Sequence, residues 1–171
     1  KRLFLVVFLM ATLIFSHSIH AEYNKNLLIN PDAETGDMSG WTITANGGNQ
    51  WKVVQSGNNK MFATSYDWDK RTQLIDLVAK GFSPEELDLS PPIEISEEFY
   101  GVFCPDYYYL EVELLDANQK VIGAYRTGSR INGGKCQDIP VNYESHIFND
   151  YSPGVRYIRW SDGGKDSEWW W

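Results

Sequence analysis

The sequence predicts an all-β fold, an antiparallel β-sandwich of about ten strands with one short helix. Short segments rich in aromatic and β-branched residues recur along the chain, and clusters of glycine, asparagine and serine separate them. The segment 107–116 (YYYLEVELLD) alternates in the way expected of a strand with one buried face. Only the segment 83–89 (SPEELDL) carries a clear helical signal, so strands should dominate the domain.

The first half of the chain supplies four expected strands and the helix. The strands are expected at 41–44, 51–55, 61–66 and 72–78, with turns at 46–50 (NGGNQ) and 56–60 (SGNNK). In the helix, Ser83 can cap the N-terminus and Pro84 suits the first helical position. Glu85 and Glu86 favour the first turn, where the helix dipole is positive.

The second half of the chain supplies the remaining strands. The two faces of 107–116 should carry Tyr108, Leu110, Val112 and Leu114 on the buried side and Tyr109, Glu111 and Glu113 on the other. A turn at DANQ should lead into a strand at 120–125 and so complete a hairpin. The segment 144–148 (ESHIF) alternates like a strand, and 155–160 (VRYIRW) follows a YSPG turn. SDGGK (161–165) is expected to turn the chain once more, into the final tryptophan segment.

The N-terminal segment 1–21 has the layout of a secretory signal peptide. Two basic residues precede a mostly apolar run at 3–15, and a polar stretch then ends at Ala21. The apolar run is shorter than the ~20 residues that span a bilayer, so an uncleaved anchor is the less favoured alternative. Residues 22–171 then form one domain, and we expect the protein to be secreted or to reside in the ER lumen.

The charge balance argues against nucleic acid as a partner. The chain has 15 basic and 23 acidic residues, a formal net charge of −8, and no basic run. Such a surface repels phosphate backbones.

The two cysteines, Cys104 and Cys136, can form a disulfide bond in an oxidising compartment. Such a bridge would stabilise the fold by roughly 3–4 kcal/mol. Two separate thiols are the alternative, which the sequence leaves open.

Catalytic signals are weak. His146 is the only histidine after the leader, and its alternating segment favours a packed or surface side chain over a general base. No Gly-x-Ser-x-Gly motif is present, and one histidine with two distant cysteines does not supply a zinc site. The nearest carboxylate pairs, which a glycosidase would need, are interpreted as solvated surface: Glu97 with Glu98, Glu111 with Glu113, and Asp162 with Asp166. We therefore expect a protein that is not an enzyme and needs neither metal nor cofactor.

Five long motifs carry a family resemblance. In chain order they are NLLINPDAETGDMSGWTI, NGGNQWKV, FATSYDWDKRTQLIDL, LLDANQKVIG and HIFNDYSPGVRYIRWSDGGKD. Together they resemble the F-box-associated (FBA) domain, the C-terminal part of the sugar-recognising F-box proteins and of the fish nonspecific cytotoxic cell receptor proteins. The resemblance runs from residue 26 to 171. It implies a β-sandwich of about ten antiparallel strands, related to galactose-binding jelly rolls.

The resemblance also implies a function and a site. Glycan-binding members of the family hold the inner chitobiose of high-mannose N-glycans on glycoproteins, with aromatic residues on loops at one end of the sandwich. Tyr66 matches one of these contacts, although a core tyrosine in an alternating strand is the alternative. Trp169 and Trp170 match the first two positions of an aromatic-aromatic-Lys triplet, although they could instead cover the core. Trp171 stands in place of the lysine donor, which favours the alternative of a recognition domain without sugar affinity.

Three further expectations follow from the resemblance. Too few residues lie between the leader and the domain for an F-box, so docking to the Skp1 adaptor is not expected. The family has a further glycine-containing strand after this point, so the domain is expected to be truncated at its C-terminus. If the leader is not functional, the alternative is a cytoplasmic role in substrate recognition for ubiquitin-dependent glycoprotein degradation.

Overall fold

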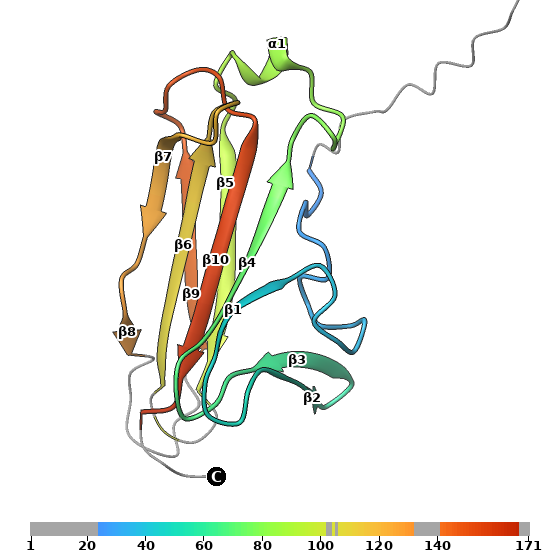
Figure 1. Ribbon diagram of the computed structural model, residues 1–171, viewed down its shortest axis with the longest axis vertical. Coiled ribbons are helices and arrows are strands. Elements are labelled where there is room, and N and C mark those ends of the chain that lie inside the picture. Colours follow the sequence, from blue (N-terminus) through green and yellow to red (C-terminus); the bar gives the residue numbers. More distant parts are fainter. Residues whose placement is uncertain (1–23, 102–103, 105, 132–140, 168–171) are drawn as a thin grey trace, which may run out of the picture.

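The computed structural model describes residues 24–101, 104, 106–131 and 141–167. In this part of the chain, ten strands form three antiparallel sheets and a single short helix joins two of the strands (Figure 1). The fold class predicted from the sequence is therefore confirmed.

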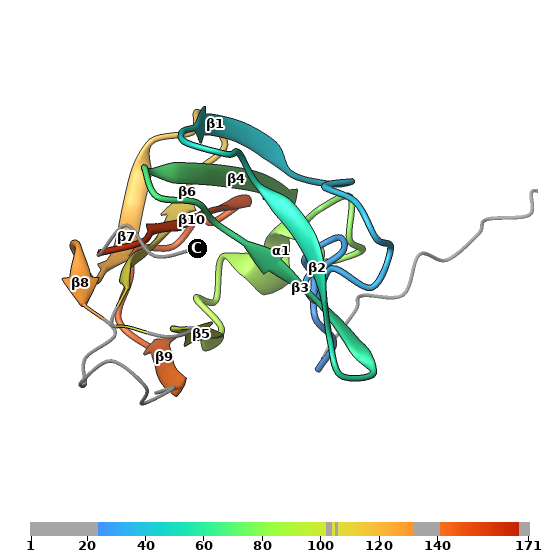
Figure 2. The same ribbon diagram turned by 90° about the horizontal axis from the view of Figure 1, so that it is seen from below.

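One large sheet faces two small ones. The large sheet consists of β1 (Thr42–Asn46), β4 (Asp69–Asp76), β10 (Tyr157–Lys165), β6 (Tyr107–Leu115) and β7 (Val121–Arg126) in this spatial order, and β8 (Arg130–Ile131) pairs with the start of β6. The small sheets are β2 (Lys52–Ser56) with β3 (Asn59–Ala63), and β5 (Ile93–Tyr100) with β9 (Val141–Phe148). Seen along the strands, the small sheets lie across from the large one, so the molecule has two layers (Figure 2).

The hydrophobic core fills the space between these layers. Its members include Leu110, Val112, Leu114, Ile158 and Trp160 from the large sheet, and Ile95 and Phe148 from the β5–β9 sheet. The expected buried face of β6 is confirmed, because its four side chains are at most 6% exposed. Phe99 of β5 stacks on Tyr108 of β6 at 4.3 Å between ring centroids, which ties the layers together.

Helix α1 (Pro84–Leu87) begins as the sequence predicts. The Ser83 hydroxyl accepts a hydrogen bond from the Glu86 amide at 3.2 Å, and the Glu86 carboxylate accepts one from the Ser83 amide at 2.9 Å. This reciprocal capping box satisfies two backbone donors that an open helix end would leave unpaired.

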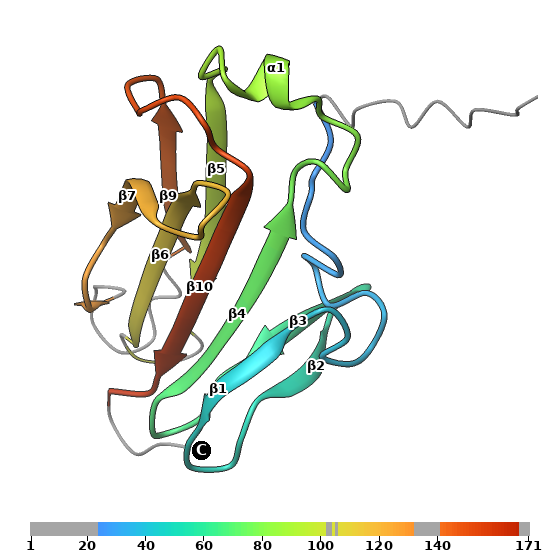
Figure 3. The ribbon, with the colours of Figure 1, turned by 45° about the horizontal axis from the view of Figure 1, so that its top comes forward.

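The expected turn at SDGGK is wrong, because residues 161–165 continue strand β10. This strand runs between β4 and β6 in the middle of the large sheet (Figure 3). A Cβ atom on Gly163 would lie 2.2 Å from the carbonyl oxygen of Asp69, and one on Gly164 would lie 3.0 Å from that of Tyr107. The glycine pair therefore allows close approach of backbones within a sheet, and not a reversal of the chain.

Other differences concern strands that the sequence prediction lacks or misplaces. It contains neither β5 nor β8, and it starts β9 three residues late. Strand β3 spans Asn59–Ala63, so Tyr66 lies in the loop that follows it and not in an alternating strand.

Several sequence predictions fall outside the described residues. The leader 1–21, Cys136 and the tryptophans at 169–171 are among these positions. Cys104 is 5% exposed and disulfide-bonded, and its pairing with Cys136 stays a prediction. Within the described part of the chain, no helix is long and apolar enough to cross a membrane.

Candidate functional site

Three segments that are far apart in the sequence meet at one end of the sandwich, the lower end in Figure 1. They are the β1–β2 loop, the β3–β4 loop and the end of β10, and Ser65 joins them. The Ser65 hydroxyl accepts a hydrogen bond from the Asn49 amide at 2.5 Å, and its carbonyl oxygen accepts one from the Asp166 amide at 2.9 Å. Ser65 is only 7% exposed, so these bonds hold the β3–β4 loop from both sides. We call this region the loop end.

Glycine allows the first two loops to touch. Gly48 has a φ of +52°, and a Cβ atom there would lie 2.3 Å from the Ser65 hydroxyl oxygen. A side chain at this position would push the β1–β2 loop away from the β3–β4 loop. The same Cβ atom would lie 3.1 Å from Cδ1 of Tyr66, so the tyrosine ring rests against Gly48.

Of the predicted sugar-binding residues, only Tyr66 lies within the described part of the chain. Tyr66 lies at the loop end and is half-buried. Trp169, Trp170 and Trp171 follow Ser167 by two to four positions, and they lie outside the described residues. Their predicted contacts with a sugar therefore stay predictions, although the last described residues of the chain are at the expected end.

A group of aromatic and basic side chains beside the loop end is absent from the sequence prediction. Trp68 and Tyr109 meet edge to face, with ring centroids 5.8 Å apart. The Lys70 ammonium lies 5.5 Å from the Trp68 ring centroid and 5.4 Å from that of Tyr109. The Lys165 ammonium lies 5.8 Å from the Trp68 centroid and 5.1 Å from that of Tyr107. We call these five residues the aromatic–lysine cluster.

A buried ion pair lies on the opposite, inner face of the same strands. The Nε atom of Arg71 donates to Asp162 at 2.8 Å, and Trp160 Nε1 donates to the other carboxylate oxygen at 3.0 Å. The Arg71 guanidinium also lies 3.8 Å from the Trp41 ring centroid and 4.0 Å from that of Phe62. One side chain thereby links β4, β10 and the β2–β3 hairpin.

The sequence interpretation placed Asp162 and Glu97 on solvated surface, and the structure contradicts it for both carboxylates. Asp162 is 1% exposed, and the side chain of Glu97 is 16% exposed at 3.6 Å from Arg71 Nη2. Burial raises the pKa of Glu97 well above its usual range, and the charge of Asp162 adds to this rise. Burial also raises the pKa of Asp162, against the opposing effect of Arg71 and Trp160. Alternating patterns identify which residues share a face but not which charged residues face the core.

Asp69 is a second buried carboxyl, at the start of β4 beneath the loops. It is 0% exposed, and among the described residues neither of its side-chain oxygens has a well-formed hydrogen bond. Burial raises the pKa of Asp69 to about 6, although the nearby amides of Ser65 and Gly47 oppose the rise. The Gly47 amide donates instead to the carbonyl oxygen of Trp68 at 3.2 Å. The folded protein therefore binds this proton more tightly than the unfolded chain does.

We expect this carboxyl to make stability depend on pH. Because its pKa is higher in the folded state, ionisation of Asp69 destabilises the fold as pH rises from about 4 to about 6. Asp69→Asn removes this ionisation. The free energy of unfolding of the variant minus that of the wild type should increase across this range and then level off. Chemical denaturation at pH 4, 5, 6, 7 and 8 measures the difference, and parallel curves for the two proteins would contradict the assignment.

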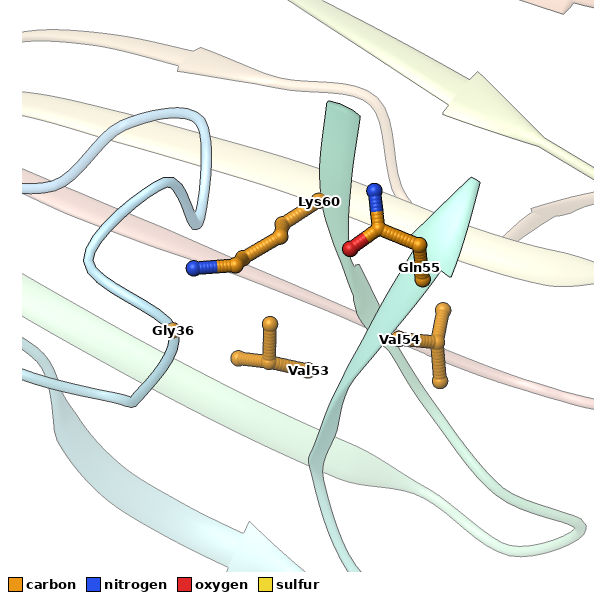
Figure 4. A pocket seen from close by; sticks show the side chains of 5 residues that line it. All are labelled: Gly36, Val53, Val54, Gln55 and Lys60. Carbon is orange, nitrogen blue, oxygen red and sulfur yellow. The ribbon is translucent and has the colours of Figure 1, made fainter. Parts of the chain in front are cut away.

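A separate hollow lies on the β2–β3 hairpin, lined by Gly36, Val53, Val54, Gln55 and Lys60 (Figure 4). Lys60 is its one charged lining residue, and its ammonium already donates to the carbonyl oxygen of Glu34 at 3.1 Å. The hollow therefore lacks the convergent aromatic and polar groups of the loop end. Within the described ranges, no group of three or more His, Cys, Asp and Glu side chains could hold a metal ion.

The fold and the loop end define the protein as an antiparallel β-sandwich whose loops gather aromatic side chains at one end. The chain belongs to the family described as "F-box associated region" (FBA), whose sequence model matches residues 19–171. The family expectation from the sequence motifs is thus confirmed.

Relatives of the chain are F-box proteins. It is 36% identical over 163 residues to F-box only protein 6 of Bos taurus, covering 85% of this chain and 59% of the relative. It is 33% identical over 162 residues to F-box only protein 2 of Bos taurus, covering 85% and 54% respectively. With F-box only protein 44 of Homo sapiens it shares 34% identity over 173 residues, covering 91% and 64%. The chain thus spans between about half and two thirds of the length of these relatives.

Two solved structures have a similar chain path. One is TmCBM61 in complex with β-1,4-galactotriose, at a TM-score of 0.49 and 14% identity, covering 82% of this chain and 87% of that one. The other is the enzymatically active domain of the bacteriophage CBA120 tailspike protein 4, at a TM-score of 0.47 and 15% identity, covering 82% of this chain and 19% of that one.

Proposed function

We propose that this domain binds carbohydrate at its loop end, and that its ligand is the chitobiose core of N-linked, high-mannose glycans on glycoproteins. Membership of the FBA family supports the proposal. The observation that carries it is the β3–β4 loop, which Ser65 fixes from two sides and which holds two half-exposed aromatic residues, Tyr66 and Trp68. Rigid aromatic side chains at such a loop provide the faces on which pyranose rings stack. The domain acts by binding and not by catalysis.

Titration of the purified protein with chitobiose tests this function. Trp170→Ala should cost at least ~2 kcal/mol of binding, roughly thirtyfold in affinity, because aromatic anchors carry most of the energy of a small site. Tyr66→Ala should also weaken binding, whereas Tyr143→Ala should not, because Tyr143 is 60% exposed on β9 of the other layer. Stability should change little in each variant.

Two results would contradict the proposal. One is the absence of chitobiose binding by the wild type. The other is a loss of about 3–5 kcal/mol of stability in Trp170→Ala without a specific loss of affinity, which would make Trp170 a core residue. Trp171→Lys is the companion variant: tighter binding would show that the missing donor limits affinity.

A second candidate is a recognition domain that uses the same loop end for protein contacts without sugar affinity. The observation in its favour is Trp171, which occupies the position of the lysine donor in glycan-binding relatives.

The sequence of the leader supports a secreted or lumenal location, and a cytoplasmic role in ubiquitin-dependent glycoprotein degradation is the alternative. The mass of the protein recovered from expressing cells discriminates between them, because a chain that retains residues 1–21 in the cytosol would rule out secretion.

A further inference from the structure

We propose that the aromatic–lysine cluster recognises an anionic sugar, a pyranose that carries a carboxylate, sulfate or phosphate group. The inference rests on the proposed function, that the domain binds carbohydrate, and it specifies a class of ligand for the surface beside the loop end.

The cluster lies on one face of the large sheet. In the strand register, Lys70 of β4 pairs with Gly163 of β10, which pairs with Tyr109 of β6, and Lys165 pairs with Tyr107 in the adjacent row. The residues that alternate with them along the strands, such as Asp69 and Asp162, are buried on the inner face. The lysines and tyrosines of the cluster therefore share the outer face. Trp68 joins them from the β3–β4 loop, and all five side chains are half-exposed.

Neither lysine of the cluster has an acidic partner among the described residues. Within the described residues, neither ammonium group forms an ion pair or a hydrogen bond, whereas all five described arginines form ion pairs with carboxylates. Glu111, the next residue after Tyr109 on this face of β6, is bound by Arg126 at 2.5 Å. In a chain with 23 acidic and 15 basic residues, two neighbouring ammonium groups without a carboxylate partner in the described part of the chain can pair with an anion from outside.

The rings between the lysines specify a sugar and not a free anion. The Tyr109 ring lies against Gly163, where a Cβ atom would be 2.9 Å from its Cε1, and it meets the Trp68 ring edge to face. Gly163 has no side chain to separate Lys70 from Tyr109. Aromatic faces stack on the C–H groups of a pyranose, and ammonium groups on either side bind an acidic substituent of the same ring. The Tyr109 hydroxyl is protonated at neutral pH, as in any tyrosine, and can act as a donor; burial and the nearby carboxylates raise its pKa further above the usual value. The net charge of −8 disfavours a polyanion such as nucleic acid far more than a singly charged sugar.

Matched pairs of sugars test the inference. The pairs are glucuronic acid with glucose, N-acetylglucosamine 6-sulfate with N-acetylglucosamine, and mannose 6-phosphate with mannose. Each sugar is titrated into the wild-type protein, and NMR measures its affinity. We expect at least one anionic sugar to bind about tenfold more tightly than its neutral counterpart, with a preference that falls as salt rises. The three pairs show which anionic group is recognised.

Two double variants control for charge. Lys70→Gln with Lys165→Gln should abolish the preference. Lys52→Gln with Lys120→Gln makes the same change in net charge at two exposed positions outside the cluster, in β2 and directly before β7, and it should retain the preference. Equal binding of neutral and anionic sugars, or a preference that survives the Lys70/Lys165 change, would overturn the inference. Inorganic phosphate or sulfate that binds as tightly as the sugars would overturn it as well.

Chitobiose binding separates the two proposals. If chitobiose binds and the anionic preference is absent, carbohydrate binding stands and only this inference fails. If an anionic sugar binds through the two lysines and chitobiose does not, this inference stands and the choice of chitobiose is wrong. If no sugar of either class binds, both proposals fail.

Discussion

Replacing Arg71 with leucine is expected to lower the free energy of unfolding by about 3–5 kcal/mol at pH 7. The substitution leaves the Asp162 carboxylate, which is 1% exposed, without its cationic partner. It also removes the guanidinium that packs between the Trp41 and Phe62 rings, and with it a contact between the large sheet and the β2–β3 hairpin. Urea denaturation monitored by tryptophan fluorescence measures the loss.

Two further variants show whether the buried charge is the cause. Arg159→Leu removes a surface arginine, whose side chain is 37% exposed and paired with Glu113, and should cost less than about 1 kcal/mol. Arg71→Leu combined with Asp162→Leu removes both charges and should recover much of the stability, because the isolated buried carboxylate accounts for most of the loss. A cost for Arg71→Leu as small as that for Arg159→Leu would contradict the assignment.

Gly163→Ala is expected to destabilise the protein by about 3 kcal/mol or more, at the upper end of the range for overpacking. The new methyl group would lie 2.2 Å from the carbonyl oxygen of Asp69 and 2.9 Å from Cε1 of Tyr109. The first of these atoms belongs to the backbone of the neighbouring strand, so β4 and β10 would have to separate. Thermal and chemical denaturation would both report the change.

Gly123→Ala is the matched control, because Gly123 is also in a strand of the large sheet. A Cβ atom there would meet side-chain atoms of Leu114 and Tyr151 at 3.3 Å, which can adjust by a few tenths of an ångström. Its cost should therefore be much smaller than that of Gly163→Ala. Equal costs at the two positions would show that loss of glycine flexibility, and not a backbone clash, determines the effect.

Local patterns predicted the parts of the fold that local physics determines. The alternation of β6 identified its buried face, and Ser83 with Pro84 identified the start of the helix. The same local reasoning failed at Gly163 and Gly164, since two glycines in sequence indicate a turn. Only the neighbouring strands show why glycine is needed there, because the atoms that exclude a Cβ come from Asp69 and Tyr107, more than fifty residues away in the chain.

Strand β5 and the aromatic–lysine cluster were missed for related reasons. In β5 the inward position of Glu97 breaks the apolar alternation, and its partner Arg71 is on another strand. The cluster combines Trp68 and Lys70 with Tyr107, Tyr109 and Lys165, which only the register of β4, β10 and β6 brings together. The alternation of β6 did place Tyr109 on the outer face of the strand, and this was the one signal in the sequence that pointed to the cluster. The tryptophans after Ser167 were found by family resemblance, and their roles await the binding experiments.

The position of β10 has a consequence for how the protein is made. This strand is the last described strand in the chain, yet it lies in the middle of the large sheet. It pairs with β6 along its whole length and with β4 from Tyr157 to Gly164. During translation, β1 with β4 and β6 with β7 can form two separate pairs, each with an open edge that β10 must later fill. The large sheet cannot close until residues 157–165 have left the ribosome. Until then these edges can pair with other nascent chains, so we expect chaperone binding and aggregation to compete with folding in this interval.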